Sequence, residues 1–326
     1  MFKVGIIGCG GISRPHIEGF LAIPSRVKIT AVCDVSPEAM KNASEKAGGA
    51  EAFASYADVI KKADIDAVDI LLPHHLHKDT IVRAADAGKH ILCEKPLCIS
   101  LREAAEITKA VESNKVTLMC AHNQIFSPCI QEAKRRLQAG ELGRIFQIRT
   151  CDCFLGGLTD WGWRAPLATA GGGELIDTGY HPSYMLLYLA GSKPVAVTAM
   201  LGKYVQRQIE GEDCANVLVR FENESVGCIY TSWAWEWPVG YNQFHVIGEK
   251  GQMYGRSNLF SIKFIKEEPV ETQLPSCQEF HAEVDHFIQC LETGTAPVQS
   301  HIDGIAVLKV ILGAYEAAKT NTIVTL

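Results

Sequence analysis

The first dozen residues constrain the fold more than any other part of the chain. Lys3 to Ser13 reads KVGIIGCGGIS, an apolar run that turns into glycines. Gly8 allows a tight turn out of a strand, Gly10 lets the backbone approach a pyrophosphate, and Ser13 is small enough for close packing of helix and strand. The helix that follows would point its N-terminal N–H groups at the phosphates. The run indicates a strand and a nucleotide-binding turn, with a plain glycine turn in a parallel sheet as the alternative.

An acidic residue after the next strand favours the nucleotide interpretation. Val27 to Cys33 reads VKITAVC, and Asp34 follows directly. The dinucleotide-binding fingerprint has an acid at this point, where the carboxylate binds the ribose hydroxyls of adenosine. Because a carboxylate repels a 2′-phosphate and residues 35–40 contain no arginine, we expect NAD as the cofactor in preference to NADP.

Strands and helices alternate over the first 122 residues. After Asp34, Ser36-Pro37 opens a helix, residues 79–87 form another, and the capping box Ser100-Leu-Arg-Glu103 opens a third. The strands between them are expected at 67–72, 90–95 and 116–122. This alternation predicts an α/β Rossmann domain with a doubly wound parallel sheet, whose ligands collect at the carboxyl ends of the strands.

The pattern changes from about Ser127. A helix over 127–139 leads into strands joined by short turns, and helices over 278–292 and 301–319 finish the chain. The strands are expected at 144–154, 195–204, 213–222, 225–235 and 242–248. Short turns between consecutive strands indicate an antiparallel sheet. We therefore predict two domains, an NAD-binding domain over 1–122 and an α+β domain for substrate binding and oligomerisation over 123–326.

Composition excludes several classes of protein. The formal net charge is -6, without a basic stripe, which argues against nucleic acid as a partner. No apolar run approaches the roughly 18 residues needed to span a bilayer. The chain enters its first strand without a charged leader and cleavage site. We expect a cytoplasmic protein that does not bind membranes.

Two groups of residues raise the question of a metal. The twelve cysteines are scattered, and Cys151-Asp-Cys153 is their only close pair. Without a second pair or a histidine at ligand spacing, buried cysteines are the simpler interpretation. The cluster His74-His75-Leu-His77 follows a predicted strand, where we expect an active-site loop. We predict no metal site.

Two segments carry residues suited to chemistry. Glu94-Lys95-Pro96 ends a strand of the nucleotide-binding half, so Lys95 is placed to reach a reacting group, with a solvated lysine as the alternative. Asp177 and His181 stand four apart, so on a helix they would share a face, and a carboxylate can orient an imidazole and stabilise its protonated form. Pro182 indicates that the helix kinks or restarts there. A capping aspartate and a core histidine are the alternatives.

Four segments together resemble one known family. GIIGCGGIS, AVCD, GKHILCEKPL and GGGELIDTGYH, in this order and spacing, resemble the glucose-fructose oxidoreductase, inositol 2-dehydrogenase and rhizopine catabolism (Gfo/Idh/MocA) family. The resemblance implies a Rossmann domain, a second domain with a large open antiparallel sheet that commonly mediates oligomers, and NAD(P)-dependent redox chemistry on sugars or cyclitols. It also implies that Lys95, Asp177 and His181 are catalytic and that the Lys95-Pro96 bond is cis.

The expected binding residues follow from these segments. Substrate is expected at Lys95, Asp177 and His181, and at Trp163 and Arg164 of the segment Asp160-Trp-Gly-Trp-Arg164, because aromatic faces and guanidinium donors suit a sugar ring. Trp161 has packing as an equally weighted alternative. The cofactor is expected at the following residues: Gly8, Gly10, Gly11, Ile12, Ser13, Asp34, Leu72, Pro73, His74, His77, Glu94, Lys95 and Asn123.

Two positions depart from the family pattern. The segment His122 to Pro128 lacks an arginine often found in the family, and Tyr184 replaces an acid common in relatives.

Three tryptophans alternate along an expected strand, namely Trp233, Trp235 and Trp237. We interpret them as part of a subunit interface more readily than as a ligand platform.

These observations favour an NAD-dependent oxidoreductase that oxidises a secondary hydroxyl of a sugar, glycoside or inositol, or reduces the corresponding ketosugar. The first alternative is a glycosidase that keeps its NAD bound and oxidises the sugar transiently. The second is an NAD-binding regulator without turnover. We expect a homo-oligomer, a dimer or a tetramer, that associates through the antiparallel sheet.

Overall fold

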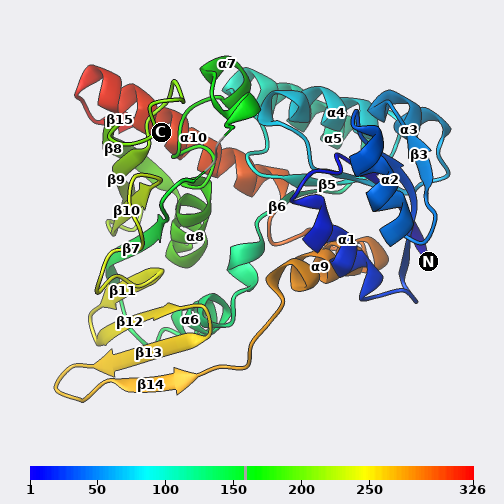
Figure 1. Ribbon diagram of the computed structural model, residues 1–326. Coiled ribbons are helices and arrows are strands. Elements are labelled where there is room, and N and C mark those ends of the chain that lie inside the picture. The colour runs from blue at the N-terminus through cyan, green and yellow to red at the C-terminus, as the bar shows by residue number, and fades with distance from the viewer. Residues whose placement is uncertain (158–159) are drawn as a thin grey trace. The chain divides into compact units, whose positions relative to one another are not determined.

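The computed structural model describes residues 1–157 and 160–326, and the chain forms two sheets in two compact units (Figure 1). The first unit comprises Met1–Asn123 and Gln278–Ile305, and the second comprises Gln124–Cys277 and Ala306–Leu326. The chain thus returns to its first unit near the C-terminus. The boundary expected between residues 122 and 123 stays a prediction about domains.

The first unit is built on a six-stranded parallel sheet in the order β3-β2-β1-β4-β5-β6. Its order reverses between β1 and β4, which is the point where doubly wound sheets bind ligands. Helices α4 and α5 pack together on one face, and α1 and α9 on the other (Figure 1). The strands are β1 (Phe2–Ile7), β2 (Val27–Cys33), β3 (Glu51–Phe53), β4 (Ala67–Ile70), β5 (His90–Glu94) and β6 (Leu118–Ala121). The helices are α1 (Ser13–Leu21), α2 (Pro37–Lys46), α3 (Tyr56–Lys62), α4 (His74–Asp86), α5 (Leu101–Asn114) and α9 (Glu279–Thr293), and α10 (His301–Thr320) begins here.

Local sequence explains where these helices begin. The Ser36 hydroxyl accepts from the Ala39 N–H at 3.3 Å, and Pro37 follows at the first helical position of α2. The Ser100 hydroxyl accepts from the Glu103 N–H at 3.2 Å and opens α5. The expected α/β fold of the first unit is confirmed, and β3 is the strand that sequence patterning missed.

The second unit holds a nine-stranded sheet in the order β14-β13-β12-β11-β7-β10-β9-β8-β15. Helix α8 packs on β7 and β10, and α6 packs on β12 and β13. The strands are β7 (Ile145–Cys153), β8 (Pro194–Gly202), β9 (Cys214–Phe221), β10 (Val226–Ser232), β11 (Phe244–Gly248), β12 (Gly251–Arg256), β13 (Leu259–Phe264), β14 (Val270–Gln273) and β15 (Val324–Thr325). The helices are η1 (Asn123–Phe126), which begins in the first unit, α6 (Pro128–Gln138), η2 (Gly162–Arg164), α7 (Leu167–Ala170) and α8 (Tyr180–Ala190).

The large sheet is antiparallel except where β7 pairs in parallel with β10. Short turns predicted the direction of consecutive strands correctly. They carry no information on β7, because η2, α7 and α8 separate it from the next strand and let it run alongside β10. Four strands, β12 to β15, were not anticipated.

The tryptophan strand predicted over 225–235 is wrong in its last part. β10 ends at Ser232, and Trp233 leaves the strand to donate its backbone N–H to Asp213 O at 2.8 Å. Trp233 is buried, whereas Trp235 is 68% exposed. Trp237 follows in the connection to β11, where its indole N–H donates to Tyr241 O at 2.9 Å. The three rings therefore do not form a row on one face of the sheet.

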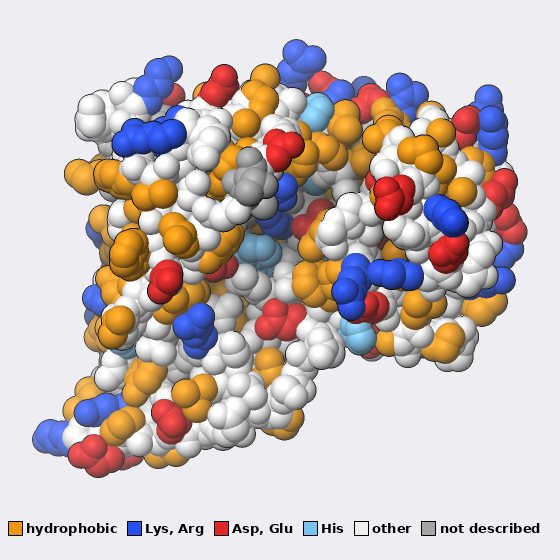
Figure 2. Space-filling view, viewed as in Figure 1, with side chains coloured by type: hydrophobic (Ala, Val, Ile, Leu, Met, Phe, Trp, Pro, Cys, Tyr) orange, Lys and Arg blue, Asp and Glu red, His pale blue; other side chains and the backbone are white. Residues whose placement is uncertain are grey.

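Acidic and basic side chains are interspersed on the face shown in Figure 2. Within the described part of the chain, none of the helices combines the length and apolarity required to cross a bilayer.

Candidate active site

The glycine turn after β1 combines a structural glycine with an open surface. Gly8 has φ +101°, and a Cβ there would lie 2.3 Å from Leu71 O, so only glycine fits. At Gly10 and Gly11 a Cβ would meet nothing within 4 Å among the described residues. The backbone of these two residues is therefore free to approach a ligand, which is the fit that a pyrophosphate requires.

Helix α1 starts directly after this turn. The Ser13 hydroxyl donates to Gly10 O at 2.7 Å, and Ile12, at the N-cap, is 39% exposed. Among the described residues, no side chain caps the first turn of α1. Uncapped N–H groups and the helix dipole suit a phosphate. A pocket of about 360 Å³ beside the turn is lined by backbone of the turn and by side chains of α1 and α2.

Asp34 holds the turn through its carboxylate. One oxygen accepts from the Cys9 N–H at 2.7 Å and the other from the Ser36 N–H at 2.7 Å. A carboxylate has about four lone-pair sites, so Asp34 keeps acceptor capacity for ribose hydroxyls. The residues of this turn thus fit the adenosine and pyrophosphate parts of a dinucleotide.

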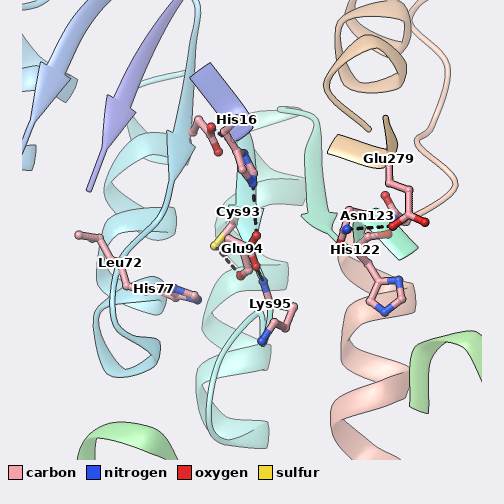
Figure 3. Close-up of polar contacts among 11 residues, drawn as sticks. His16, Leu72, His77, Cys93, Glu94, Lys95, His122, Asn123 and Glu279 are labelled. Carbon is pink, nitrogen blue, oxygen red and sulfur yellow. Dashed lines mark hydrogen bonds and ion pairs between the residues drawn. The ribbon is translucent and has the colours of Figure 1, made fainter. Parts of the chain in front are cut away.

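Glu94 and Lys95 at the end of β5 face different partners (Figure 3). The Glu94 carboxylate accepts from the Lys95 backbone N–H at 3.0 Å, and its other oxygen lies 3.2 Å from His16 Nε2. The Lys95 side chain extends away from His16 (Figure 3). The Lys95-Pro96 peptide is cis, as the family resemblance implied.

The histidine cluster lies in the first turn of α4, so the expected loop is a helix start, and its place at the active site stays a prediction. Pro73, at the N-cap with φ −55°, sets the helix start immediately before His74. His77 is fully buried, with Nε2 at 2.7 Å from Leu72 O and Nδ1 at 2.8 Å from Pro96 O. Burial lowers the pKa of His77, against the effect of these two carbonyls. His77 therefore ties the end of β4 to the turn that follows Lys95.

Asn123, the last residue of the first segment, contacts the returning chain. Its side-chain amide donates to Glu279 Oε2 at 3.1 Å (Figure 3). Glu279 is the first residue of α9. Helix α9 therefore helps to position a residue expected at the cofactor, a role that the sequence did not suggest.

In the second unit, Arg164 and Asp177 form an ion pair. Arg164 Nε donates to Asp177 Oδ2 at 2.7 Å, and the guanidinium lies 4.3 Å from the centroid of the Trp163 ring. The structure thus brings together three residues that were expected at the substrate. Trp161 is instead buried against Trp233, with ring centroids 5.0 Å apart, which is the packing alternative.

Buried carboxylates shape the loop that carries Asp177. Glu212 accepts from the Leu175 N–H at 2.9 Å and from the Tyr315 hydroxyl at 3.0 Å. Gly173 is required by packing, since a Cβ would lie 2.1 Å from Glu212 O. Burial raises the pKa of Glu212. The Glu174 carboxylate accepts a hydrogen bond from the Thr231 hydroxyl, and burial raises the pKa of Glu174 well above the usual range. Glu212 and Glu174 both make hydrogen bonds, and these bonds hold the loop in place.

A new helix, α8, begins close to Pro182, where the sequence indicated that the helix kinks or restarts. The Asp177 N–H donates to Glu174 O at 3.2 Å within a turn, and α8 begins at Tyr180. His181 lies in its first turn, where its N–H donates to Thr178 O at 2.9 Å. Pro182 is tolerated because the first turn of a helix needs no intrahelical N–H donors. Asp177 and His181 therefore belong to a turn and a helix start, not to one continuous helix.

The predicted site residues divide between the two units. Lys95 and the cofactor residues belong to the first, and Trp163, Arg164, Asp177 and His181 to the second. Sequence reasoning missed His16, which contacts Glu94, and Glu212, which holds the Asp177 loop. Asp69, a charge inside the apolar run AVDILL, was the one clue to a buried polar cluster.

The search for a metal site gives no candidate. Over residues 1–157 and 160–326, no three His, Cys, Asp or Glu side chains are arranged to hold an ion. Cys151 and Cys153 have sulfurs 3.8 Å apart, and none of the twelve cysteines, all of which are described, forms a disulfide.

A parallel sheet with a glycine turn and an acid after the second strand defines a dinucleotide-binding protein. Residues 2–122 match the model of an oxidoreductase family with an NAD-binding Rossmann fold, and residues 130–254 match the GFO/IDH/MocA C-terminal domain. The chain belongs to the GFO/IDH/MocA family of oxidoreductases, as its motifs predicted. NAD as the cofactor type is likewise supported by the family.

Several characterised relatives are similar over most of their length. Levoglucosan dehydrogenase of Pseudarthrobacter phenanthrenivorans is 26% identical over 82% of this chain and 77% of its own. An NAD-dependent scyllo-inositol 2-dehydrogenase of Bacillus subtilis is 27% identical over 96% of this chain and 92% of its own.

Solved structures show the same fold. An aldose-aldose oxidoreductase from Caulobacter crescentus, solved with glycerol, superposes with a TM-score of 0.89 at 26% identity, covering 100% of this chain and 99% of its own. Levoglucosan dehydrogenase in complex with NADH and levoglucosan gives a TM-score of 0.89 at 24% identity, covering 99% of both chains.

Proposed function

We propose that this oxidoreductase oxidises a secondary hydroxyl of a sugar, glycoside or inositol by transferring the hydride of the carbon that bears it to NAD, or reduces the corresponding ketosugar by the reverse step. The observation that carries the proposal is the Arg164–Asp177 ion pair, 2.7 Å long, at the turn that leads into His181. The ion pair fixes the Asp177 carboxylate four residues before the His181 imidazole, in a chain whose first unit fits a dinucleotide. The relatives that bear sugar and inositol dehydrogenase names support this substrate class.

Each of the three catalytic candidates has a distinct role in the proposal. His181 accepts the proton of the hydroxyl, because imidazole titrates near neutral pH in its ordinary state. Asp177 orients His181 and stabilises its protonated form, while Arg164 fixes the Asp177 carboxylate. Lys95 donates a hydrogen bond to the reacting oxygen. When bound, NAD supplies the hydride acceptor.

The cofactor residues stay as expected from sequence, with structural support that differs among them. The backbone at Gly8 to Ser13 and the Asp34 carboxylate fit the pyrophosphate and the adenosine ribose. The proposed nicotinamide end consists of Leu72, Pro73, His74, His77, Glu94, Lys95 and Asn123. Trp163 and Arg164 are proposed to bind the sugar ring and its hydroxyls.

Two coarser expectations join the proposal. Twelve cysteines without a disulfide among them support a reducing, cytoplasmic location. Strand β9 alternates buried and exposed residues, and its exposed row includes Leu218, which is 48% exposed, and Asn216, which pairs with Met200 of β8, itself 83% exposed. A sheet face with exposed apolar side chains supports a homo-oligomer formed through this face. Light scattering tests that part, and a monomer at micromolar concentration would contradict it.

The substrate class is tested by a panel of inositols, anhydrosugars, aldoses and simple glycosides, with purified protein and NAD. The expected result is net NADH formation with at least one polyol. Cleavage of a glycoside without net NADH would replace the proposal by a glycosidase that oxidises its substrate transiently. Binding of NADH without turnover of any member would favour a regulator.

A further inference from the structure

His16 is buried between two carboxylates, and its ring points at Glu94, the last residue of β5 (Figure 3). Its Nδ1 lies 3.0 Å from Asp69 Oδ2, and its Nε2 lies 3.2 Å from Glu94 Oε1. Asp69 comes from β4, and both it and His16 are completely buried. An imidazole can donate from both nitrogens only as an imidazolium, so the arrangement between two acids is that of a charged histidine.

Helix α9 closes this cluster on the remaining side. The Phe280 ring lies 5.5 Å from the His16 ring, and α1 and α9 pack closely enough that a Cβ on Gly19 would be 3.2 Å from Phe280 O. Glu283 of α9 is fully buried, and its carboxyl group interacts electrostatically with His16, Asp69 and Glu94. Among the described residues, no donor reaches the carboxyl oxygens of Glu283 at normal hydrogen-bond geometry. The His122 backbone nevertheless acts to lower the pKa of Glu283, which favours the ionised form.

The charges of the cluster follow from this geometry. Burial disfavours a charged His16, but the two carboxylates outweigh burial and raise its pKa well above the usual range. Burial raises the pKa of Glu283 well above its usual range, which favours its neutral form. Burial also raises the pKa of Asp69, an effect that His16 opposes.

We propose that His16 is a positioning residue for Lys95, which rests on the proposed role of Lys95 as a catalytic group. As an imidazolium anchored by Asp69, His16 fixes one oxygen of Glu94. The other oxygen of Glu94 accepts from the Lys95 N–H at 3.0 Å, which fixes the point where the lysine leaves β5. His16 touches neither cofactor nor substrate in this scheme and acts through Glu94 alone.

Asp69→Asn separates this role from a merely structural one. The asparagine oxygen still accepts from Nδ1, but the lost charge lets His16 become neutral at lower pH. A neutral imidazole with its proton on Nδ1 has a lone pair on Nε2, which repels Glu94. We expect kcat of Asp69→Asn to fall roughly tenfold or more as pH rises from about 6 to about 8, relative to the wild type.

Two companion variants, His16→Gln and His90→Asn, test whether the effect is specific to His16. His16→Gln is expected to lose roughly tenfold in kcat without that pH dependence, with the NADH dissociation constant within about threefold of wild type. His90→Asn is the matched control, because His90 is a half-buried histidine at the other end of β5 that accepts from the Thr117 N–H at 3.0 Å. Its kcat is expected to change by less than about twofold.

Two measurements do not depend on turnover. Acylation of Lys95 by acetic anhydride, measured by peptide mass spectrometry, is expected to change at least about threefold in rate in Asp69→Asn and His16→Gln but not in His90→Asn. Nitrogen-15 spectra of histidine-labelled wild type are expected to show an imidazolium at His16 at neutral pH.

The outcomes separate this inference from the proposed function. Altered acylation of Lys95 with no turnover of any polyol would retain the positioning role and reject the dehydrogenase. Polyol turnover with unchanged kcat, pH profile and acylation in both variants would overturn the positioning role. A neutral His16 at neutral pH in the wild type would also overturn it, even if neither variant folds.

Discussion

Gly8→Ala and Gly10→Ala should separate stability from cofactor binding within one turn. In Gly8→Ala the new Cβ meets Leu71 O at 2.3 Å and the residue keeps φ +101°. The left-handed backbone costs about 1–2 kcal/mol and the clash about 1–3 kcal/mol. The Leu71 carbonyl cannot move freely, because the Leu71 N–H donates to Ile7 O at 2.8 Å. The expected loss is therefore about 2–5 kcal/mol.

Gly10→Ala is the matched control in the same turn. Its Cβ would meet nothing within 4 Å among the described residues, so the free energy of unfolding should change by less than about 0.5 kcal/mol. The methyl group would instead occupy the space proposed for the pyrophosphate. We expect NADH affinity to fall at least about tenfold, which corresponds to about 1.4 kcal/mol.

Thermal unfolding and NADH fluorescence titration measure the two effects. A loss of about 2–5 kcal/mol should lower Tm of Gly8→Ala by roughly 4–20 °C, at about 2–4 °C per kcal/mol for a unit of this size. Tm of Gly10→Ala without ligand should equal that of the wild type. Normal NADH affinity in Gly10→Ala, or equal Tm losses in both variants, would refute the assignment of this turn.

Three further predictions concern the site and the surface. kcat/KM should be higher with NAD than with NADP, and a wild type that prefers NADP would contradict this. Asp34→Ala should lower the ratio of kcat/KM with NAD to kcat/KM with NADP roughly tenfold or more, because the carboxylate that repels the 2′-phosphate is then gone. His181→Ala should lower kcat by about two to four orders of magnitude and remove the acidic limb of the pH profile, whereas Lys95→Ala should lower kcat with NAD affinity within a few-fold; the opposite pattern would make lysine the base. The pKa of Glu132 is lowered to about 2, first by the hydrogen bond from Arg135, so its ion pairs stabilise the fold above the ordinary pKa of 4.5 and this stability is lost as pH falls towards 2. Glu132→Gln should therefore cost about 1 kcal/mol at pH 7, allowing for solvent screening, and nothing near pH 2 in urea titrations.

Local sequence predicted those parts of the fold that depend on neighbours in the chain. The caps at Ser36 and Ser100 and the glycine at position 8 obey rules that act over four residues or fewer, and all three behave as predicted. The order and type of most helices and strands also followed from periodicity. The family assignment rested on short motifs and was confirmed by the comparisons.

Contacts between distant segments were not predictable in the same way. His16 and Asp69 are 53 residues apart, and nothing near either residue specifies the other. The charge within AVDILL demanded a buried partner, but several histidines and basic residues were available in the sequence. The parallel pairing of β7 with β10 and the return of α9 to the first unit likewise depend on tertiary packing.

The transfer of deuterium from substrate to NAD tests the proposed chemistry most directly. A polyol that is turned over would be prepared with deuterium on the carbon that bears the reacting hydroxyl, and the nicotinamide product analysed by mass spectrometry. We predict deuterated NADH in amounts that exceed the enzyme, with an equal amount of ketone. Unlabelled nicotinamide, or deuterium retained in a hydrolysed sugar without net NADH, would contradict the account.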